Sequence, residues 1–202
     1  MKVKNLGLID YKEALDVQLT HVQSVIEDDS NEVILVCHHP SVVTLGKKST
    51  PSDLIGWDGQ VYEISRGGKA TYHGPGQIVV YPIINLEKRG NDIYKFLRNL
   101  ELAMVKTLEN FGIENSKGDP DSTGVWIDNK KIASIGIAIK RWVTYHGLAI
   151  NIFHDDQAFK GINPCGLNVS VMTSLEELSG NKVERFAFEN QLCSNLSELL
   201  KN

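Results

Sequence analysis

Apolar, β-branched runs follow one another without an intervening helix in two parts of the chain, and this order leaves few folds open. The first part extends from 33 to 84 and the second from 125 to 152. Helical spacing of apolar residues occurs only before, between and after these parts. Consecutive strands can be joined by hairpins, whereas strictly alternating strands and helices are typical of parallel sheets. The sequence therefore predicts an α+β fold, with a largely antiparallel or mixed central sheet flanked by helices.

Local patterns predict the individual elements. Three long helices are expected, from an Asp10–Glu13 start signal to Ile26, from an Asn91 cap to Phe111 before Gly112, and over Phe186–Leu200. A short helix is expected to start near Thr173 or Ser174. Gly147 is a candidate bulge, and residues 128–131 form a predicted hairpin turn. Strands are expected at Leu6–Ile9, Val33–Cys37, Val42–Leu45, Val61–Ile64, Ile78–Ile84, Val125–Ile127, Ile132–Ile139 and Trp142–Ile152.

Composition narrows the class of protein. The chain has 202 residues, 42% hydrophobic and 23% charged, which predicts one globular domain over residues 1–202. A formal net charge of −4 argues against non-specific binding to nucleic acid or anionic membranes. The longest apolar run, Ile78–Ile84, is far shorter than the roughly 20 residues of a spanning helix. Three cysteines are too few for a disulfide framework, so a cytoplasmic protein is expected.

Residues 66–77 concentrate glycine and hydrogen-bonding side chains between two strand patterns. Four glycines accompany Arg66, Thr71, His73 and Gln77. Glycine allows backbone to approach a ligand closely. The spacing is neither that of a P-loop nor that of a dinucleotide-binding turn, because a strand pattern follows it. A ligand-binding loop is therefore favoured over a surface loop with turn glycines.

The run Arg66–Pro82 resembles the motif R-G-G-x-x-T-x-H-G-x-G-Q-x-x-x-Y-P of lipoyl (octanoyl) transferases, the octanoyl-[acyl carrier protein]:protein N-octanoyltransferases. These enzymes move an octanoyl group from acyl carrier protein to a lysine of lipoyl domains. Ser65 departs from the pattern, because an acidic residue is expected there. The resemblance implies the catalytic-domain fold of lipoate–protein and biotin–protein ligases. It covers most of the chain through further blocks in family order, at Tyr11–Gln18, His39–Gly46, Gly124–Gly136, His146–Asn151 and Asn163–Gly166.

Two catalytic residues are implied by the resemblance. Cys165 matches the nucleophile that forms an acyl-thioester, and Lys131 matches the lysine that favours its thiolate. On position alone, Cys165 is equally consistent with a small buried residue, and packing is favoured for Cys37 and Cys193. A nearby cation stabilises a thiolate and lowers its pKa. Lys130 and Lys131 point to opposite faces of a strand, so only one of them can readily face a cleft.

The resemblance also implies an acyl-substrate site built from three segments. Burying about six methylenes at about 0.8 kcal/mol each provides roughly 5 kcal/mol before binding costs. His73 either orients the thioester or is a structural hydrogen-bonding residue. Neither His38–His39 nor His154–Asp156 has a specific metal-ligand spacing, so no metal is expected. The implied substrate residues are Arg66, Gly67, Gly68, Lys69, Ala70, Thr71, Tyr72, His73, Ser134, Ile135, Gly136, Gly147, Leu148 and Ala149.

The implied reaction is the first step of protein lipoylation. An octanoyl or lipoyl group passes from acyl carrier protein to Cys165, and then to the lysine of apo lipoyl domains of 2-oxoacid dehydrogenases and glycine cleavage H protein. Aminolysis of a thioester is downhill, so no ATP, metal or organic cofactor is expected. A monomer is expected, with Lys69, Lys140 and Arg141 attracting acidic partners. The alternatives are an ATP-dependent lipoate–protein ligase, which does not need Cys165, and a non-catalytic module that binds lipoyl domains.

Overall fold

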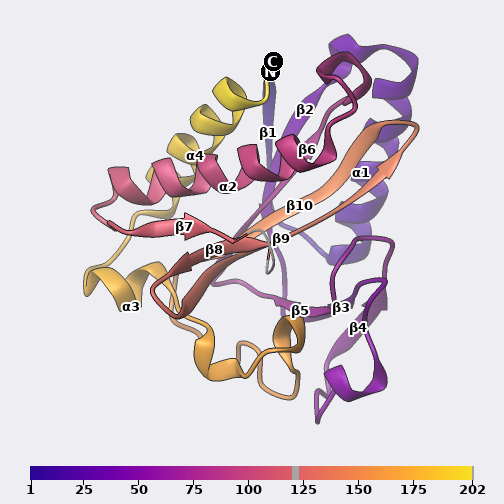
Figure 1. Cartoon of the computed structure of the whole chain (residues 1–202). Helices are drawn as coiled ribbons and strands as arrows, with labels where there is room; N and C mark the ends of the chain where they lie inside the picture. Colours follow the sequence, from indigo (N-terminus) through magenta and orange to yellow (C-terminus); the bar gives the residue numbers. More distant parts are fainter. Residues whose placement is uncertain (120–122, 202) are drawn as a thin grey trace.

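Two β-sheets form the framework of the chain (Figure 1). The computed structural model describes residues 1–119 and 123–201, and only the backbone of Cys165. In these residues the larger sheet contains, in spatial order, β1 (Lys2–Leu8), β2 (Val33–His38), β6 (Gln77–Ile83), β10 (Val143–Asn151), β9 (Lys130–Lys140), β8 (Gly124–Ile127) and β7 (Ser116–Gly118). The smaller sheet contains β4 (Gln60–Glu63), β3 (Val42–Leu45) and β5 (Ala70–His73).

The pairing of the strands confirms the predicted mixed sheet. In the larger sheet β1 and β2 are parallel, and the other neighbouring strands are antiparallel. In the smaller sheet β3 runs parallel to β4 and antiparallel to β5. A parallel pair needs a crossover, which α1 (Tyr11–Glu27) supplies between β1 and β2.

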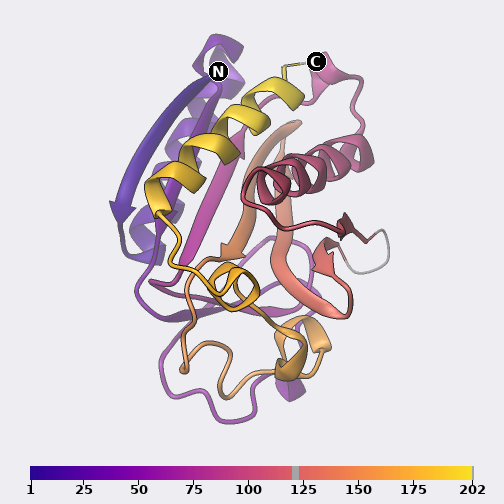
Figure 2. The same cartoon turned by 90° about the vertical axis from the view of Figure 1, so that its left-hand side faces the viewer.

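Helices cover both faces of the larger sheet. On one side α1 packs against β6 and β10. On the other side α2 (Ile93–Asn110) and α4 (Arg185–Leu199) lie against each other across the sheet (Figure 2). The short α3 (Leu175–Ser179) precedes α4, and its Ser174–Glu177 capping box confirms the predicted start. All of these helices were expected from the sequence.

Strand β2 shows why its apolar run is continuous. Val33, Leu35 and Cys37 belong to the cluster beneath α1, whereas Ile34 and Val36 belong to the cluster beneath α2 and α4. Successive side chains of a strand point to opposite faces, so a strand covered on both faces is apolar throughout.

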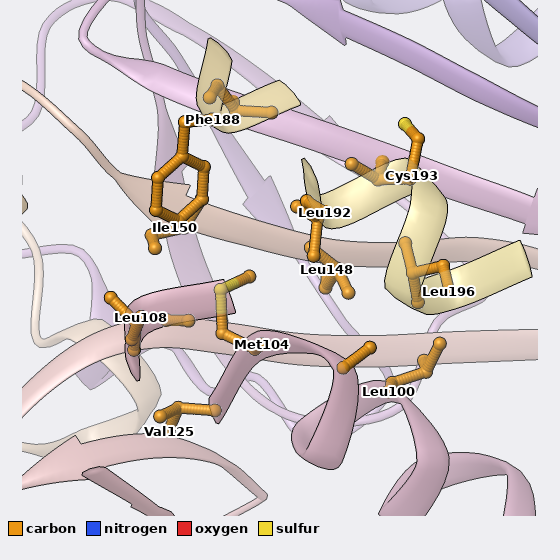
Figure 3. Packing of buried hydrophobic residues seen from close by; sticks show 14 of the residues in the cluster. Leu100, Met104, Leu108, Val125, Leu148, Ile150, Phe188, Leu192, Cys193 and Leu196 are labelled. Atoms are coloured by element: carbon orange, nitrogen blue, oxygen red, sulfur yellow. The ribbon is translucent and has the colours of Figure 1, made fainter. Parts of the chain in front are cut away.

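The main core lies between the larger sheet and the α2–α4 pair (Figure 3). Met104 of α2 and Leu192 of α4 lie over Leu148 and Ile150 of β10 (Figure 3). All four side chains are buried. This packing holds β10 in place. Residues 146–149 of the same strand line the candidate site described below.

Three local expectations were wrong. The glycine-rich segment is not a continuous loop, because residues 70–73 form β5 and pair with β3. The glycines on either side of these four residues favour a loop. All four residues are nevertheless buried, so packing against the rest of the protein holds them in a strand. Helix α2 is capped not by Asn91 but by Asp92, whose carboxylate accepts a hydrogen bond from the Lys95 N–H at 2.8 Å. Gly112 follows the helix with a φ of 78°, as expected.

Gly147 is not a bulge. It pairs in regular register with Gly136, and the irregularity in this part of the sheet lies between Val125 and Trp126. A Cβ on Gly147 would lie 2.1 Å from the Val80 carbonyl oxygen of the neighbouring strand. Glycine is therefore needed here because the β6 backbone approaches β10 closely.

Replacing Gly147 with alanine is expected to lower the free energy of unfolding by about 3 kcal/mol or more, because β6 and β10 must separate. Chemical denaturation followed by circular dichroism measures this loss. Gly67→Ala is the matched control, since its added Cβ would meet no atom closer than 3.9 Å. Equal stability of the two variants would contradict the packing explanation.

The smaller sheet holds the segment that contains Cys165. Val43 of β3 and Tyr72 of β5 form a third core cluster with Phe159 and Ile162. The 3-10 turn Pro164–Gly166 follows and packs against β5. No helix in the described residues is both long and apolar enough to cross a membrane.

Candidate active site

A cavity of about 50 Å³ lies where β5, β9 and β10 come together. We call it the acyl cavity. It brings together eleven of the residues that the resemblance assigned to substrate, from three separate parts of the sequence. They are Arg66, Gly68, Lys69, Thr71, His73, Ser134, Ile135, Gly136, Gly147, Leu148 and Ala149.

Three of the predicted substrate residues lie elsewhere. Gly67 lines a neighbouring groove. Ala70 and Tyr72 alternate with Thr71 and His73 along β5, and so they face the other side of the smaller sheet. The Tyr72 hydroxyl donates a hydrogen bond to Asp155 at 2.8 Å. Tyr72 therefore supports the segment that precedes Cys165, on the far side from the acyl cavity.

Four lining residues were missed by the sequence reasoning. Tyr11 comes from the first turn of α1, Val79 and Tyr81 from β6, and His146 from β10. Tyr11 appeared in the sequence only as a core-facing helix residue. The adjacent family block contains His146, but no spacing rule connects it with the glycine-rich segment.

Arg66 holds one wall of the cavity in place through hydrogen bonds. One guanidinium nitrogen donates to the carbonyl oxygen and the hydroxyl of Thr44, at 2.8 and 2.9 Å, and the other donates to the Gly67 carbonyl at 2.8 Å. The side chain is buried. These bonds tie the glycine pair to β3, so they hold Gly68 at the cavity.

Buried histidines and tyrosines form the deep end of the cavity. Tyr11 stacks on His73, with ring centroids 5.9 Å apart. His39 donates from Nδ1 to the Ile9 carbonyl at 2.8 Å, and its Nε2 lies 2.8 Å from the Tyr81 hydroxyl. In the neutral ring, Nε2 accepts the hydrogen of that hydroxyl.

Burial keeps the imidazoles of this cluster uncharged. Desolvation lowers the pKa of His39, and it lowers that of His73 well below the usual value, with neighbouring charges adding to the effect on His73. Desolvation, reinforced by Arg66, lowers the pKa of His146 to about 3. Burial therefore weakens all three imidazoles as bases, and it weakens His146 most clearly.

We expect the folded protein to lose stability as the pH falls below about 6.5. Below that pH the unfolded chain binds protons that buried His39, His73 and His146 do not bind, so each contributes a slope of about 1.4 kcal/mol per pH unit until its folded pKa is reached. For His146 this window extends down to about 3. Urea denaturation at several pH values measures the slope.

His146→Asn is expected to reduce that slope, since asparagine tolerates the φ of 56° at this position. His154→Asn is the control. Hydrogen bonds to Asp156 and Glu177 raise the pKa of His154, so its contribution is lost above its ordinary pKa and not below it. Parallel slopes for wild type and His146→Asn would refute this account.

Lys131 is a buried cation at the start of β9. Its side chain is 1% exposed. The ammonium donates to the Thr123 carbonyl at 3.2 Å and lies 5.2 Å from the centre of the Trp126 ring. Among the described residues no carboxylate forms an ion pair with it. The Glu101 carboxylate interacts with this ammonium electrostatically without pairing with it directly. A buried ammonium of this kind is suited to stabilise a further anion brought beside it.

Lys130 and Lys131 point in opposite directions, as expected from strand alternation. Lys130 is exposed, and its ammonium donates to the Ser170 carbonyl. Lys131 lines the groove that adjoins the acyl cavity. Of these two neighbouring lysines, Lys131 is therefore the one that faces the groove.

The loop that contains Cys165 lies close to both cavities. Its backbone forms the turn Pro164–Gly166, and a Cβ on Gly166 would lie 2.7 Å from the Lys69 ammonium. Further along, the Thr173 N–H donates to the Lys131 carbonyl at 3.1 Å. The Cys165 side chain lies outside the described part of the structure. The backbone that follows Cys165 thus approaches two of the residues that line the site, Lys69 and Lys131.

The other two cysteines are structural. Cys37 and Cys193 are both buried free thiols. Desolvation raises the pKa of the Cys37 thiol well above its usual range and that of Cys193 to about 12. Neither thiol ionises readily, so neither is suited to act as a nucleophile. Among the described residues, no group of three or more His, Cys, Asp or Glu side chains could hold a metal ion.

Comparisons with known proteins agree with this fold. The family described as lipoyl protein ligase A/B catalytic domain matches residues 10–197. An octanoyltransferase of Bdellovibrio bacteriovorus is 41% identical, covering 96% of this chain and 96% of its own length.

Solved structures show the same fold at low identity. A lipoate-protein ligase A bound with ATP has a TM-score of 0.75 at 16% identity, and the match covers 99% of this chain and 86% of that one. A biotin protein ligase from Aquifex aeolicus has a TM-score of 0.59 at 16% identity, covering 100% of this chain and 69% of its own. The fold expected from the resemblance is confirmed. The chain belongs to the lipoyl protein ligase A/B catalytic-domain family.

Proposed function

We propose that this chain is an octanoyltransferase that modifies a lysine of lipoyl domains, as the first step of protein lipoylation. The curated relative at 41% identity, which matches the chain over almost its full length, is an octanoyltransferase. The single structural observation that supports the proposal best is the buried Lys131 ammonium in a groove that it shares with Lys69, whose own ammonium lies against Gly166, the residue after Cys165. An ATP-dependent ligase has no need of that pair.

In the first step, the Cys165 thiolate attacks the thioester carbonyl of octanoyl-acyl carrier protein. The carbonyl–sulfur bond of the donor breaks, the carrier leaves as a thiol, and an octanoyl-Cys165 thioester forms. The Lys131 ammonium favours the thiolate over the thiol before the attack. Backbone N–H groups near residue 165 are candidates to stabilise the tetrahedral oxyanion.

In the second step, the uncharged amine of the acceptor lysine attacks octanoyl-Cys165. An amide forms, the Cys165 thiolate leaves, and one proton is released from the attacking nitrogen. Lys131 stabilises the leaving thiolate, which returns the enzyme to its starting charge. The conversion of a thioester to an amide is downhill, so the cycle is complete without ATP, metal or an organic cofactor.

The acyl cavity is the proposed site for the octanoyl chain. Its side walls are apolar at Ile135, Leu148, Ala149 and Val79. A volume of about 50 Å³ is small for eight carbons, so the cavity must widen when the chain enters. Tyr11 lies at one wall and stacks on Tyr62 behind it, with ring centroids 5.6 Å apart.

The remaining parts of the proposal concern where and with whom the chain acts. A monomer is sufficient, because one chain supplies every proposed catalytic and lining residue. A reducing, cytoplasmic setting suits a nucleophilic thiol and the two buried free thiols. Octanoyl-acyl carrier protein is the proposed donor, and apo lipoyl domains are the proposed acceptors.

Omission of ATP tests the proposal. The chain is mixed with octanoyl-acyl carrier protein and an apo lipoyl domain, and the acceptor mass is followed over time. We expect octanoylated lysine to form at the same rate with and without ATP. Transfer that requires ATP and free fatty or lipoic acid would establish a ligase instead, and binding of the acceptor without any transfer would establish a binding module.

A further inference from the structure

A second cavity of about 340 Å³ adjoins the acyl cavity, and we call it the lysine groove. None of the described residues that line it is acidic. Asp53 lies 4.0 Å from the Lys69 ammonium but outside the lining. Its walls combine three cations and three large apolar side chains, namely Lys48, Lys69, Lys131, Leu97, Ile135 and Ile137.

The lysine groove and the acyl cavity are continuous. Gly68, Lys69, Ile135 and Gly136 line both of them. Lys69 also lies against Gly166, the residue that follows Cys165 in the chain. The junction of the two cavities is therefore the part of the site nearest the proposed nucleophile. The acyl cavity extends from it on one side and the lysine groove on the other.

A donor thioester has the same two-armed shape. One arm is the apolar acyl chain, which suits the acyl cavity. The other arm of a carrier-bound thioester is pantetheine, an extended chain with amide and methyl groups that ends in a phosphate. The described residues that line the groove supply apolar walls and lysines and no carboxylate, which matches that second arm in both polarity and charge.

We propose that the lysine groove binds the phosphopantetheine arm of the acyl donor and that Lys48 binds its phosphate. The inference rests on the proposed octanoyl transfer. Lys48 is an exposed lining residue, and its backbone N–H donates to the Gly68 carbonyl at 3.0 Å, which anchors its backbone to the wall of the groove. Lys131 is buried at the inner part of the groove, where the thioester reacts, so it is not the phosphate ligand.

The charge of the groove also disfavours a protonated acceptor lysine as its occupant. An acceptor ammonium would bring a fourth cation among Lys48, Lys69 and Lys131. Like charges at close range oppose one another, and the low solvent access of Lys131 increases that cost. The donor arm is therefore the better match, and the acceptor lysine enters as the uncharged amine after that arm has left.

The test compares two octanoyl donors that differ only in the phosphate, octanoyl-pantetheine and octanoyl-4′-phosphopantetheine, in ATP-free transfer to an apo lipoyl domain. For wild type we expect about a tenfold lower KM with the phosphorylated donor, the size of one charge-assisted contact. Lys48→Met is expected to remove most of that difference without changing kcat. The matched control is Lys47→Met, because Lys47 is exposed next to Lys48 but does not line the groove.

Two results would overturn the assignment. One is an equal KM for the two donors with wild type, and the other is an equal effect of Lys47→Met and Lys48→Met. If wild type transfers from no donor without ATP, the proposed function fails. If it transfers equally well from both donors, only the groove assignment fails.

Coenzyme A and acyl carrier protein both present the same phosphopantetheine chemistry. Octanoyl-coenzyme A and octanoyl-acyl carrier protein are therefore tested with both lysine variants. A similar rise in KM for both donors with Lys48→Met supports recognition of the arm itself. A rise confined to the carrier-protein donor would contradict it, because Lys48 would then bind the surface of the carrier. Competition by ATP that Lys48→Met relieves would instead assign the groove to a nucleotide.

Discussion

Cys165→Ala is expected to reduce octanoyl transfer by at least about 10³-fold, because removal of a nucleophile abolishes the covalent route and leaves only the effect of binding. Both half-reactions depend on this sulfur. Release of carrier thiol from octanoyl-acyl carrier protein should therefore stop together with acceptor acylation. Rates of thiol release and of acceptor mass change measure the two steps separately.

Cys193→Ala is the matched control for that loss. Cys193 is buried against the main core, and burial raises the pKa of its thiol to about 12. We expect this variant to transfer octanoyl at close to the wild-type rate. If Cys165→Ala retained full transfer, direct attack by the acceptor on the donor would replace the two-step mechanism.

Lys131→Met is expected to lower the rate near neutral pH by about 10- to 30-fold. An opposite charge at close range shifts a thiol pKa downward by about one to three pH units, whereas a thiol at its ordinary pKa of about 8.5 is only about 3% thiolate at pH 7. Methionine suits the buried position, since the apolar side chain costs less to bury than an ammonium does. Activity should recover as the pH rises, and a pH–rate profile measures that recovery.

Lys130→Met separates this effect from a general change of charge. Lys130 is exposed and lies on the opposite face of the same strand. We expect its pH–rate profile to coincide with that of wild type. If Lys131→Met lost activity equally at every pH, the lysine would act by positioning and not by stabilising the thiolate.

The order of helices and strands was predictable because the burial of each element determines its pattern of apolar residues. The two-sided burial of β2 gives an unbroken apolar run, and the helices show apolar residues on one face. The short strand β5 was not predicted. Its four residues are held in a strand by pairing with β3, which is distant in sequence and has no local signal.

The candidate site was predictable only where the residues are close in sequence. The resemblance assigned three segments, and the structure brings eleven of those residues to one cavity. Local alternation explains why Ala70 and Tyr72 face away. Tyr11, Tyr81 and His146 also line the cavity. Their positions depend on how α1, β6 and β10 pack together, and the spacing of residues along the sequence does not predict that packing.

Gly147 shows the limit of reading glycine from sequence alone. Its position in a strand pattern is consistent with a bulge, a close approach of backbone, or a ligand contact. The structure shows close approach by the Val80 carbonyl, and the residue also lines the acyl cavity. One residue type at one position therefore satisfies a packing requirement and a proposed binding role together.

Intact mass spectrometry of a single turnover tests the central claim most directly. The chain is mixed with octanoyl-acyl carrier protein in the absence of ATP, digested at low pH and mapped, and a second sample is chased with an apo lipoyl domain. The account predicts an octanoyl adduct on Cys165 that disappears as the acceptor lysine gains the same mass. An acceptor that becomes acylated without an adduct on Cys165 at any time, or an adduct that the acceptor does not remove, would contradict it.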